Sequence, residues 1–196
     1  VDPEPAADIV VAAADNQQAQ ICFGIAKAMI ERDPDLAASC RIRKHTIAYK
    51  DARLHIVSSR SEHKHGENIS CIIFDELHLH NARMLHDALI TGMAARKDPL
   101  VLYLTTAGWD QSSLAWEQHR YASRVRDGQI NDPNWLVSIS AADADADWTD
   151  PAVWRAAHPG LGITVSEEFL RQECRRAQAT PGFVNSFRRL YLNIWT

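Results

Sequence analysis

The sequence is poor in cysteine and has no long hydrophobic run, and each shortage excludes a class of protein. Its four cysteines contain no C-x-x-C pair, and Cys71 lies in an apolar run where a thiol packs as a small hydrophobic side chain. This usage is typical of an intracellular protein and predicts no disulfide framework. No apolar stretch approaches the roughly 20 residues that cross a bilayer, and the sequence contains no signal-peptide pattern, so we expect no membrane partner.

A strong positive charge is also missing. The formal net charge is −4, so the chain has no overall basic field with which to attract nucleic acid. Any contact with nucleic acid must therefore be local or come from parts outside this sequence. Apolar residues are plentiful, because 46% of the 196 residues are hydrophobic and only 23% are charged. This length and composition predict a globular α/β domain with room for a small appended subdomain.

Apolar runs of strand length alternate with helical patterns over the first two thirds of the chain, which predicts a parallel sheet with helices on both faces. After an acidic linker, helix-start signals at Pro151 and Ser166 indicate a small helical subdomain. We therefore divide the chain into residues 1–142 and 143–196. The expected helices of the first part are residues 16–31, 82–95 and 112–127, and the expected strands are residues 9–13, 45–49, 54–57, 69–74, 100–104 and 136–139.

The first expected helix has clear start and stop signals. Asp15 or Asn16 caps its beginning, and Pro34 ends it. The apolar residues of this helix share one face, and they are Ile21, Ile25, Ala28 and Met29.

Two acids follow a continuous apolar run, and this is the strongest chemical signal in the sequence. The run C-I-I-F-D-E ends in Asp75 and Glu76, which places both carboxylates at the carboxyl end of a buried strand. Ligands bind at that end in open α/β sheets. In nucleotide hydrolases the same arrangement is the Walker B motif, in which the first acid holds Mg²⁺ and the second orients the attacking water. The alternative is a strand that ends in a solvated acidic turn.

A second strand end carries small hydroxyl residues. The apolar run 100–104 is followed by Thr105, Thr106 and, after one alanine, Gly108. Hydroxyl groups at a strand end can lie beside a γ-phosphate and respond to its loss, although an ordinary strand-to-helix turn has the same composition. An acidic strand end followed by a hydroxyl-rich one favours a nucleotide site.

These motifs together resemble a known family. The segments IIFDELHLHNARMLHDAL and VLYLTTAG, in this order, look like the ATPase domain of tailed-phage terminase large subunits. Further segments are similar to the same family, so that the resemblance covers nearly the whole chain: VVAAADNQQAQICF, KHGENISCIIFDELH, HPGLGITVSEEFLRQECRRA and FRRLYLNIW.

The resemblance implies a RecA-like P-loop NTPase core over residues 1–142, truncated at its N-terminus, and a helical lid over residues 143–196. It implies ATP and Mg²⁺ as cofactors, with Asp75 holding the metal through water and Glu76 acting on the attacking water. Thr105, Thr106 and Gly108 would couple hydrolysis to movement. The implied setting is an oligomeric ring that packages double-stranded DNA in the cytoplasm of a bacterial host, together with a small terminase subunit and a portal.

One motif of the family is missing. The sequence contains no phosphate-binding loop G-x-x-x-x-G-K-S/T. Both ends look cut, because the chain starts without methionine and stops directly after an apolar pattern. We therefore expect the phosphate-binding loop to lie before Val1 and a nuclease domain to follow Thr196. We also expect this chain to be inactive as an ATPase on its own.

Basic residues at two places have both a functional and an ordinary interpretation. Arg60 precedes the acids in a polar loop, and it is either a finger that reaches the ATP of a neighbouring subunit or a solvated charge. Arg171 and Arg175 share one face of an expected helix, which either contacts DNA or another subunit or is simply solvated.

Histidine and tryptophan residues leave further alternatives. Two H-x-H pairs flank the acids and could ligate zinc, although such pairs are common in turns. The pairs are His63 with His65 and His78 with His80. The tryptophans at positions 116, 135, 154 and 195 are expected in the core, because no basic residues interleave with them as in a base-stacking surface.

Two other functions are compatible with the sequence. The segment DELH is close to the acidic box of nucleic-acid helicases, and a helicase would continue into a second RecA-like domain. A catalytically dead prophage remnant that serves only in assembly would have the same core. The residues upstream of Val1 would separate these alternatives.

Overall fold

The computed structural model describes residues 5–58, 68–79 and 83–196. The chain folds into two compact units, Val1–Thr105 and Thr106–Thr196, and each is described by itself. The expected division into an ATPase core over residues 1–142 and a lid over residues 143–196 stays a prediction. Among the described residues, no helix has both the length and the apolar character that crossing a membrane requires.

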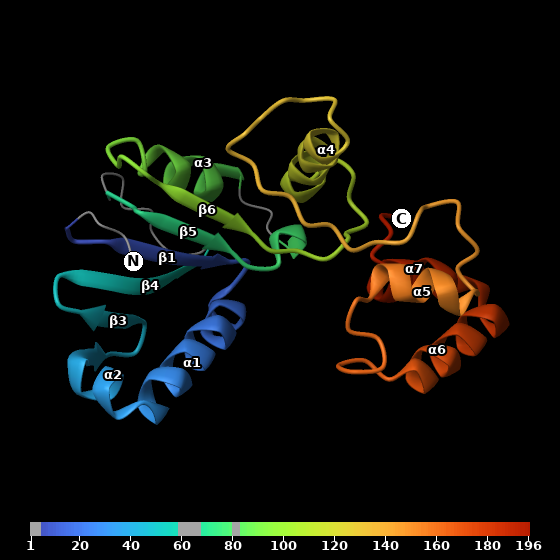
Figure 1. The fold of residues 1–196 in the computed structure, drawn as a ribbon, viewed down its shortest axis with the longest axis horizontal. Coiled ribbons are helices and arrows are strands. Elements are labelled where there is room, and N and C mark those ends of the chain that lie inside the picture. Colours follow the sequence, from blue (N-terminus) through green and yellow to red (C-terminus); the bar gives the residue numbers. More distant parts are fainter. Residues whose placement is uncertain (1–4, 59–67, 80–82) are drawn as a thin grey trace. The chain divides into compact units, whose positions relative to one another are not determined.

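The first unit contains a sheet with flanking helices, and the second contains helices joined by loops (Figure 1). The strands are β1 (Asp8–Ala13), β2 (Cys40–Ile42), β3 (Thr46–Tyr49), β4 (Ala52–Ser58), β5 (Cys71–Phe74) and β6 (Leu100–Tyr103). The α-helices are α1 (Asn16–Arg32), α2 (Pro34–Ser39), α3 (Arg83–Thr91), α4 (Leu114–Arg126), α5 (Pro151–Ala157), α6 (Glu167–Ala179) and α7 (Val184–Leu192). Two short 3₁₀ turns are η1 (Leu77–Leu79) and η2 (Pro181–Phe183).

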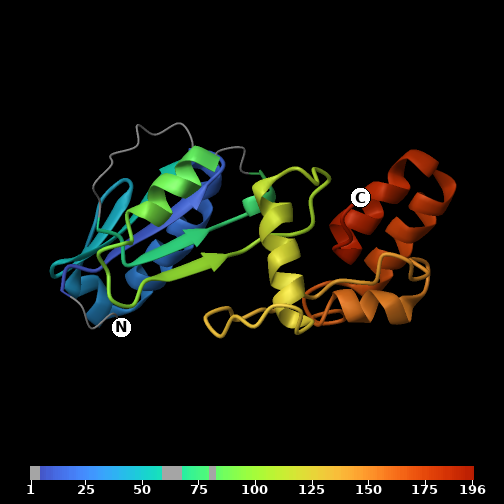
Figure 2. The same ribbon diagram turned by 90° about the horizontal axis from the view of Figure 1, so that it is seen from above.

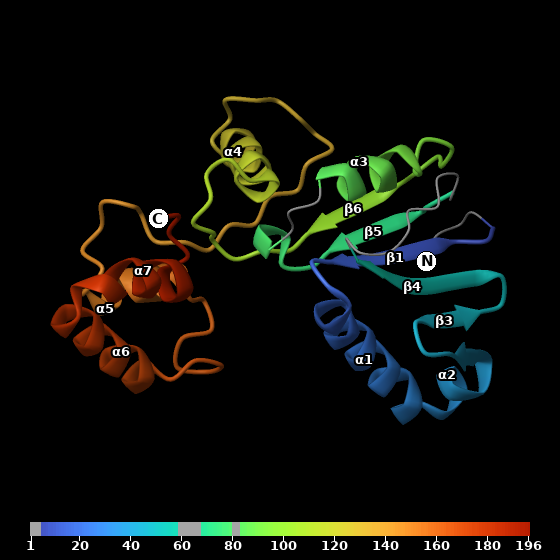
Figure 3. The same cartoon turned by 180° about the vertical axis from the view of Figure 1, so that it is seen from behind.

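The sheet is mixed, with the strand order β2-β3-β4-β1-β5-β6, and Figure 3 shows this order from behind. Strands β4, β1, β5 and β6 are parallel, and Figure 2 shows β5 and β6 running in the same direction. At the other edge, β2, β3 and β4 pair antiparallel, and Lys50 takes the left-handed φ of 53° in the turn between β3 and β4. The predicted parallel sheet is therefore confirmed for the central strands, and the antiparallel edge is added to it.

Strand β1 is the buried centre of the sheet. Val10, Val11, Ala12 and Ala13 all have 0% exposure. Because successive side chains of a strand point to opposite faces, this run shows that both faces of the sheet are covered at β1.

Helix α1 begins where the sequence predicts, but it presents a different face to the sheet. The side chain of Asp15 accepts hydrogen bonds from the amides of residues 17 and 18 and so caps the helix. Ala19 and Phe23, four residues apart, are buried, whereas the predicted apolar face is largely exposed, with Ile21 at 56%, Ile25 at 60% and Met29 at 66%. The buried side of α1 is therefore made by a small residue and one aromatic ring, and most of the predicted aliphatic face remains exposed.

One expectation about a chain break is confirmed and one about a strand is wrong. Helix α1 ends at Arg32, just before Pro34, as predicted, and Asp33 then caps a second helix, α2, in which Pro34 occupies the first turn. Residues 136–139 were expected to form a strand. Instead they are irregular, and Leu136 is 99% exposed, so within the described part of the chain this segment joins no sheet. An apolar run does not become a strand without a neighbouring edge to pair with.

A buried carboxylate fastens the amino-terminal end of β1 to β4. Asp8 receives two hydrogen bonds from the Arg53 guanidinium, at 2.8 and 2.7 Å, and His55 Nε2 lies 3.1 Å from its Oδ1. The backbone amide of Asp8 donates to the Ser70 hydroxyl at 3.2 Å. Burial raises the pKa of Asp8, but the contacts with His55 and Arg53 outweigh this effect and lower the pKa to about 2.

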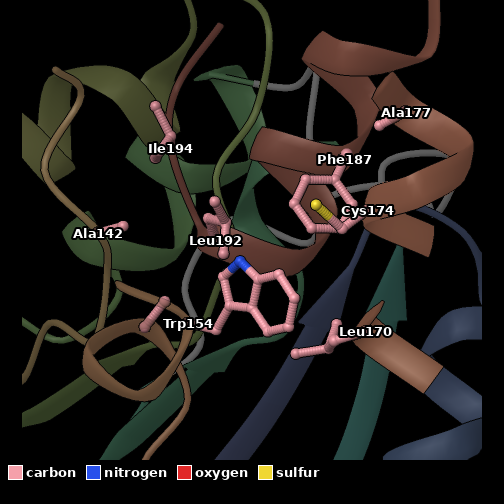
Figure 4. Packing of buried hydrophobic residues seen from close by; sticks show 9 residues of the cluster. Ala142, Trp154, Leu170, Cys174, Ala177, Phe187, Leu192 and Ile194 are labelled. Carbon is pink, nitrogen blue, oxygen red and sulfur yellow. The ribbon is translucent and has the colours of Figure 1, made fainter. Parts of the chain in front are cut away.

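The second unit has its own hydrophobic core, built from α5, α6, α7 and the segments around them (Figure 4). Trp154 is 2% exposed and lies edge-on to Phe187, and its indole N–H donates to the Trp148 carbonyl. The predicted core position of Trp154 is confirmed. Trp116 and Trp195 are half-buried and lie against each other with ring centroids 5.0 Å apart.

The Asp8 cluster predicts a specific acid sensitivity. The folded pKa of about 2 is below the ordinary aspartate value of 3.8, so the ion pair stabilises the protein above pH 4 and loses this effect as the pH falls toward 2. We expect Asp8→Asn to lower the free energy of unfolding by about 2 kcal/mol at pH 7 and by much less near pH 2. Urea denaturation at several pH values measures this, with the exposed Asp98→Asn as control. A pH-independent difference would contradict the assignment.

Candidate functional site

The two acids lie at the carboxyl end of the central parallel strands, where the sequence predicts them. β5 ends at Phe74, and three backbone hydrogen bonds continue the ladder beyond the strand ends. The Asp75 amide donates to the Ala12 carbonyl at 3.0 Å, and the Leu104 amide donates to the Phe74 carbonyl at 2.9 Å. The Leu77 amide then donates to the Leu104 carbonyl at 3.1 Å. Asp75 and Glu76 are therefore held by the sheet itself at its ligand-binding end.

Glu76 has a strained backbone and a poorly satisfied side chain. Its φ of 51° lies in the left-handed region, which residues other than glycine and asparagine adopt at a cost. Its Oε2 atom is buried, and no described residue donates a hydrogen bond to it. Strain and a buried carboxylate oxygen without a hydrogen bond in one residue are unfavourable for folding, and they are typical of groups kept for chemistry.

His78 lies between Glu76 and Thr105, and the sequence did not single it out for this role. Its Nδ1 is 3.2 Å from Glu76 Oε2, within ion-pair distance but not aligned for a hydrogen bond. The same ring nitrogen is 3.2 Å from Thr105 Oγ1, and the His78 backbone amide donates to that hydroxyl at 3.0 Å. Thus a single residue contacts both the second acid and the first hydroxyl of the next strand end. Only the chain reversal in η1 creates this proximity.

Rings from β5, β6 and α3 form a cluster next to the two motifs. The rings of Phe74 and Tyr103 stack with centroids 5.4 Å apart, and His86 contacts both. His86 Nε2 is 2.9 Å from the Tyr103 hydroxyl, and its Nδ1 is 2.9 Å from the Asp87 carboxylate. Burial and then the charge of Asp87 raise the pKa of Tyr103 to about 12, so this hydroxyl stays protonated. Phe74 and Tyr103, which precede the two motifs, are therefore held at a fixed spacing.

Helix α1 places Cys22 within electrostatic range of the first acid. Burial and then the negative charge of Asp75 raise the pKa of the Cys22 thiol. The thiol therefore stays neutral, and α1 adds no further negative charge beside Asp75 through this residue.

The expected coupling residues lie where the two compact units join. Thr105 is the last residue of the first unit, and Thr106 is the first residue of the second. Both threonines are exposed, whereas Ala107 and Gly108 are buried. The segment 105–108 is thus a covalent connection between the strand ends of the sheet and the helical unit.

Several predicted residues belong to the second unit or lie outside the described part of the chain. Arg60, and the histidines at positions 63, 65 and 80, lie outside the described residues. Among the described residues, no group of three potential ligands could hold a metal ion.

In α6, Arg171 pairs with Glu167 and Arg175 with Glu168, so each guanidinium has a partner within its own helix.

Comparison with known proteins identifies the family. Residues 1–124 match the family described as "Terminase large subunit, ATPase domain". The chain belongs to this family. The resemblance expected from the motifs is therefore confirmed.

Individual relatives of this terminase ATPase domain agree with the family. The chain is 33% identical over 130 residues to Protein YmfN of Escherichia coli strain K12, covering 66% of this chain and 29% of that protein. It is 28% identical over 193 residues to the terminase large subunit of Enterobacteria phage HK97, covering 94% of this chain and 37% of the relative. The chain thus spans about a third of the length of these relatives.

Solved structures show the same fold. The HK97 bacteriophage large terminase superimposes with a TM-score of 0.84 at 25% identity, covering 96% of this chain and 40% of that one. The large terminase ATPase domain of Thermus phage P74-26 superimposes with a TM-score of 0.60 at 14% identity, covering 100% of this chain and 79% of that one. The expected RecA-like α/β architecture with flanking helices is confirmed.

The left-handed backbone of Glu76 allows a test of whether this residue is kept for its chemistry or as a structural cap. If the acid is kept for chemistry, Glu76→Asn should raise the free energy of unfolding of this chain by about 1 kcal/mol, because asparagine tolerates the left-handed region. Glu76→Gln keeps the strain and should change stability little. Lys50→Asn, which relieves the same conformation in a remote turn, is the matched control. Thermal and urea unfolding measure all three, and a marked loss of stability in Glu76→Asn would indicate a structural cap.

Proposed function

We propose that this chain is the Walker B and lid portion of an ATP-driven motor that packages DNA for a tailed phage or prophage. The observation that carries the proposal is the state of Glu76, a strained and incompletely hydrogen-bonded acid at the carboxyl end of a central parallel strand. Family membership supports the same assignment. The helicase alternative finds no support in these comparisons.

The donor set suits a hydrated magnesium ion with its nucleotide. Mg²⁺ prefers carboxylate oxygens and keeps several of its waters, and Asp75 offers such a carboxylate at the strand end. Glu76 is the second acid, with a buried oxygen free to accept a hydrogen bond from water. Bound Mg-ATP would supply the phosphoanhydride and the charge neutralisation of its oxygens. The residues of this chain would hold the metal through Asp75 and orient water through Glu76.

His78 would fix the direction in which Glu76 points. Its ring approaches Oε2 at 3.2 Å and also touches Thr105, so it limits the positions open to the carboxylate. Thr105, Thr106 and Gly108 would then transmit the nucleotide state to the helical unit. Since Thr105 contacts the residue that positions Glu76, hydrolysis at the acids and movement of the coupling segment would be linked.

The remaining parts of the motor would lie outside this sequence. Because G-x-x-x-x-G-K-S/T does not occur in it, the longer protein would supply the phosphate-binding loop and a nuclease domain. Its partners would be double-stranded DNA, a small terminase subunit, a portal and further copies in a ring, in the cytoplasm of the bacterial host. Arg60 would reach a neighbouring ATP, and Arg171 and Arg175 would contact DNA or another subunit after giving up their pairs within α6.

Replacement of each acid tests the proposal in the longer protein. Glu76→Gln removes the group that acts on water, so kcat should fall by about 10²–10⁴-fold while Mg-ATP affinity stays within a few-fold. Asp75→Asn should weaken Mg-ATP binding as well as turnover, because the carboxylate that would hold Mg²⁺ through water is lost. Steady-state ATPase assays and Mg-ATP titrations give both quantities.

Two controls accompany this experiment. The 196-residue chain by itself should show no turnover above that of its own Glu76→Gln variant, because it lacks the phosphate-binding loop. Glu173→Gln, on α6, removes a carboxylate without touching the proposed site. Near wild-type turnover in the longer Glu76→Gln protein would contradict the Walker B assignment. Absence of turnover in the longer wild-type protein would favour the inactive assembly module.

A further inference from the structure

The coupling segment is hydrogen-bonded to the end of the last helix by one asparagine side chain. The Ala107 amide donates to Asn193 Oδ1 at 2.6 Å, across 86 positions of sequence. Asn193 Nδ2 donates to the Ser140 carbonyl at 2.9 Å. All three residues belong to the second compact unit. Asn193 therefore bridges the start of this unit, its middle and its final helix.

The geometry selects asparagine at this position for two independent reasons. Residue 193 is the C-cap of α7 and has φ 57° and ψ 32°, a left-handed conformation that asparagine and glycine tolerate. The side chain must also present an acceptor to one backbone group and a donor to another, and the short amide of asparagine does so from two separate atoms. Glycine satisfies the first requirement alone, and aspartate satisfies the acceptor half of the second.

The Ala107 end of this bridge is buried, and so are the residues on either side of Asn193. Ala107 is 4% exposed, so its amide has little access to water as a replacement partner. On the other side, Leu192 and Ile194 are buried in the core of the helical unit, and the Leu192 carbonyl accepts from the Ala142 amide. A side chain with two rotatable bonds cannot stretch, so a displacement of Ala107 must either break the bond or move the end of α7.

We propose that Asn193 is a positioning residue that transmits movement of the coupling segment to α7 and thereby to the helical unit. This inference rests on the function proposed above. Thr105 and Thr106 would respond to the nucleotide, and Ala107 follows them directly in the chain. Asn193 would carry that displacement through its Oδ1 atom to the end of α7. Its role would be in coupling, and not in the hydrolytic step.

Three variants separate the bonds from the backbone conformation. Asn193→Gly keeps the left-handed cap and removes both side-chain bonds. Asn193→Asp keeps an acceptor for Ala107 and removes the donor to Ser140. Asn185→Ala, at an exposed position of the same helix, is the control.

The first measurement is amide hydrogen exchange at Ala107 in this chain. We expect exchange to accelerate by about tenfold in Asn193→Gly and to stay near the wild-type rate in Asn193→Asp and Asn185→Ala. Unchanged protection of Ala107 in Asn193→Gly would show that the bond does not hold the segment and would overturn the inference.

The second measurement compares ATP turnover with DNA translocation in the longer protein. Asn193→Gly should keep turnover within about threefold and lose about tenfold or more in translocation, whereas Asn193→Asp should retain most of both. A proportional loss of both activities would indicate a merely structural role, and unchanged translocation would also overturn the inference. Failure of the proposed function is recognised separately, because turnover would then be absent in wild type or insensitive to Glu76→Gln. In that case the coupling role of Asn193 would be rejected too. The exchange rate of the Ala107 amide would still show whether the bond to Asn193 holds the segment.

Discussion

The continuation of the parallel ladder beyond the strand ends is the constraint on which the site depends. Backbone bonds from Asp75 to β1, from Leu104 to β5 and from Leu77 back to Leu104 fix the loop after β5 against the strand end of β6. Because these bonds use the main chain, they place the acids whatever side chains surround them. The buried centre at β1 and the aromatic contacts of α3 make this frame rigid.

This rigid frame can hold one residue in an unfavourable state. Glu76 combines a left-handed backbone with a buried carboxylate oxygen to which no described side chain or amide donates. Neither feature stabilises the fold, and a loose loop would relax to remove both. His78 approaches the carboxylate without forming an aligned hydrogen bond. It therefore limits where the carboxylate points, while the Oε2 atom can still accept a hydrogen bond. Such an arrangement suits a group that must bind water at a defined position.

In the proposed function, coupling between the sheet and the helical unit would depend on the position of a few consecutive residues. Thr105 contacts the site residue His78, and two residues later Ala107 is hydrogen-bonded to Asn193 at the end of α7. A change at the strand end therefore has a covalent path of two residues to the helical unit. No particular arrangement of the two units is needed for this path, because the chain itself supplies the connection.

The sequence by itself determined the central strands, the acids at the end of β5 and the hydroxyl residues after β6, because burial and alternation leave local patterns in the residues. It also indicated a cap at Asp15 or Asn16 and a helix start at Pro151, because capping acts on neighbouring amides. Only the tertiary structure decided that residues 136–139 form no strand, that Ile25 faces outward, and that His78 and Asn193 reach the site and the coupling segment. These outcomes depend on partners distant in sequence, and no local pattern encodes a contact across 86 positions.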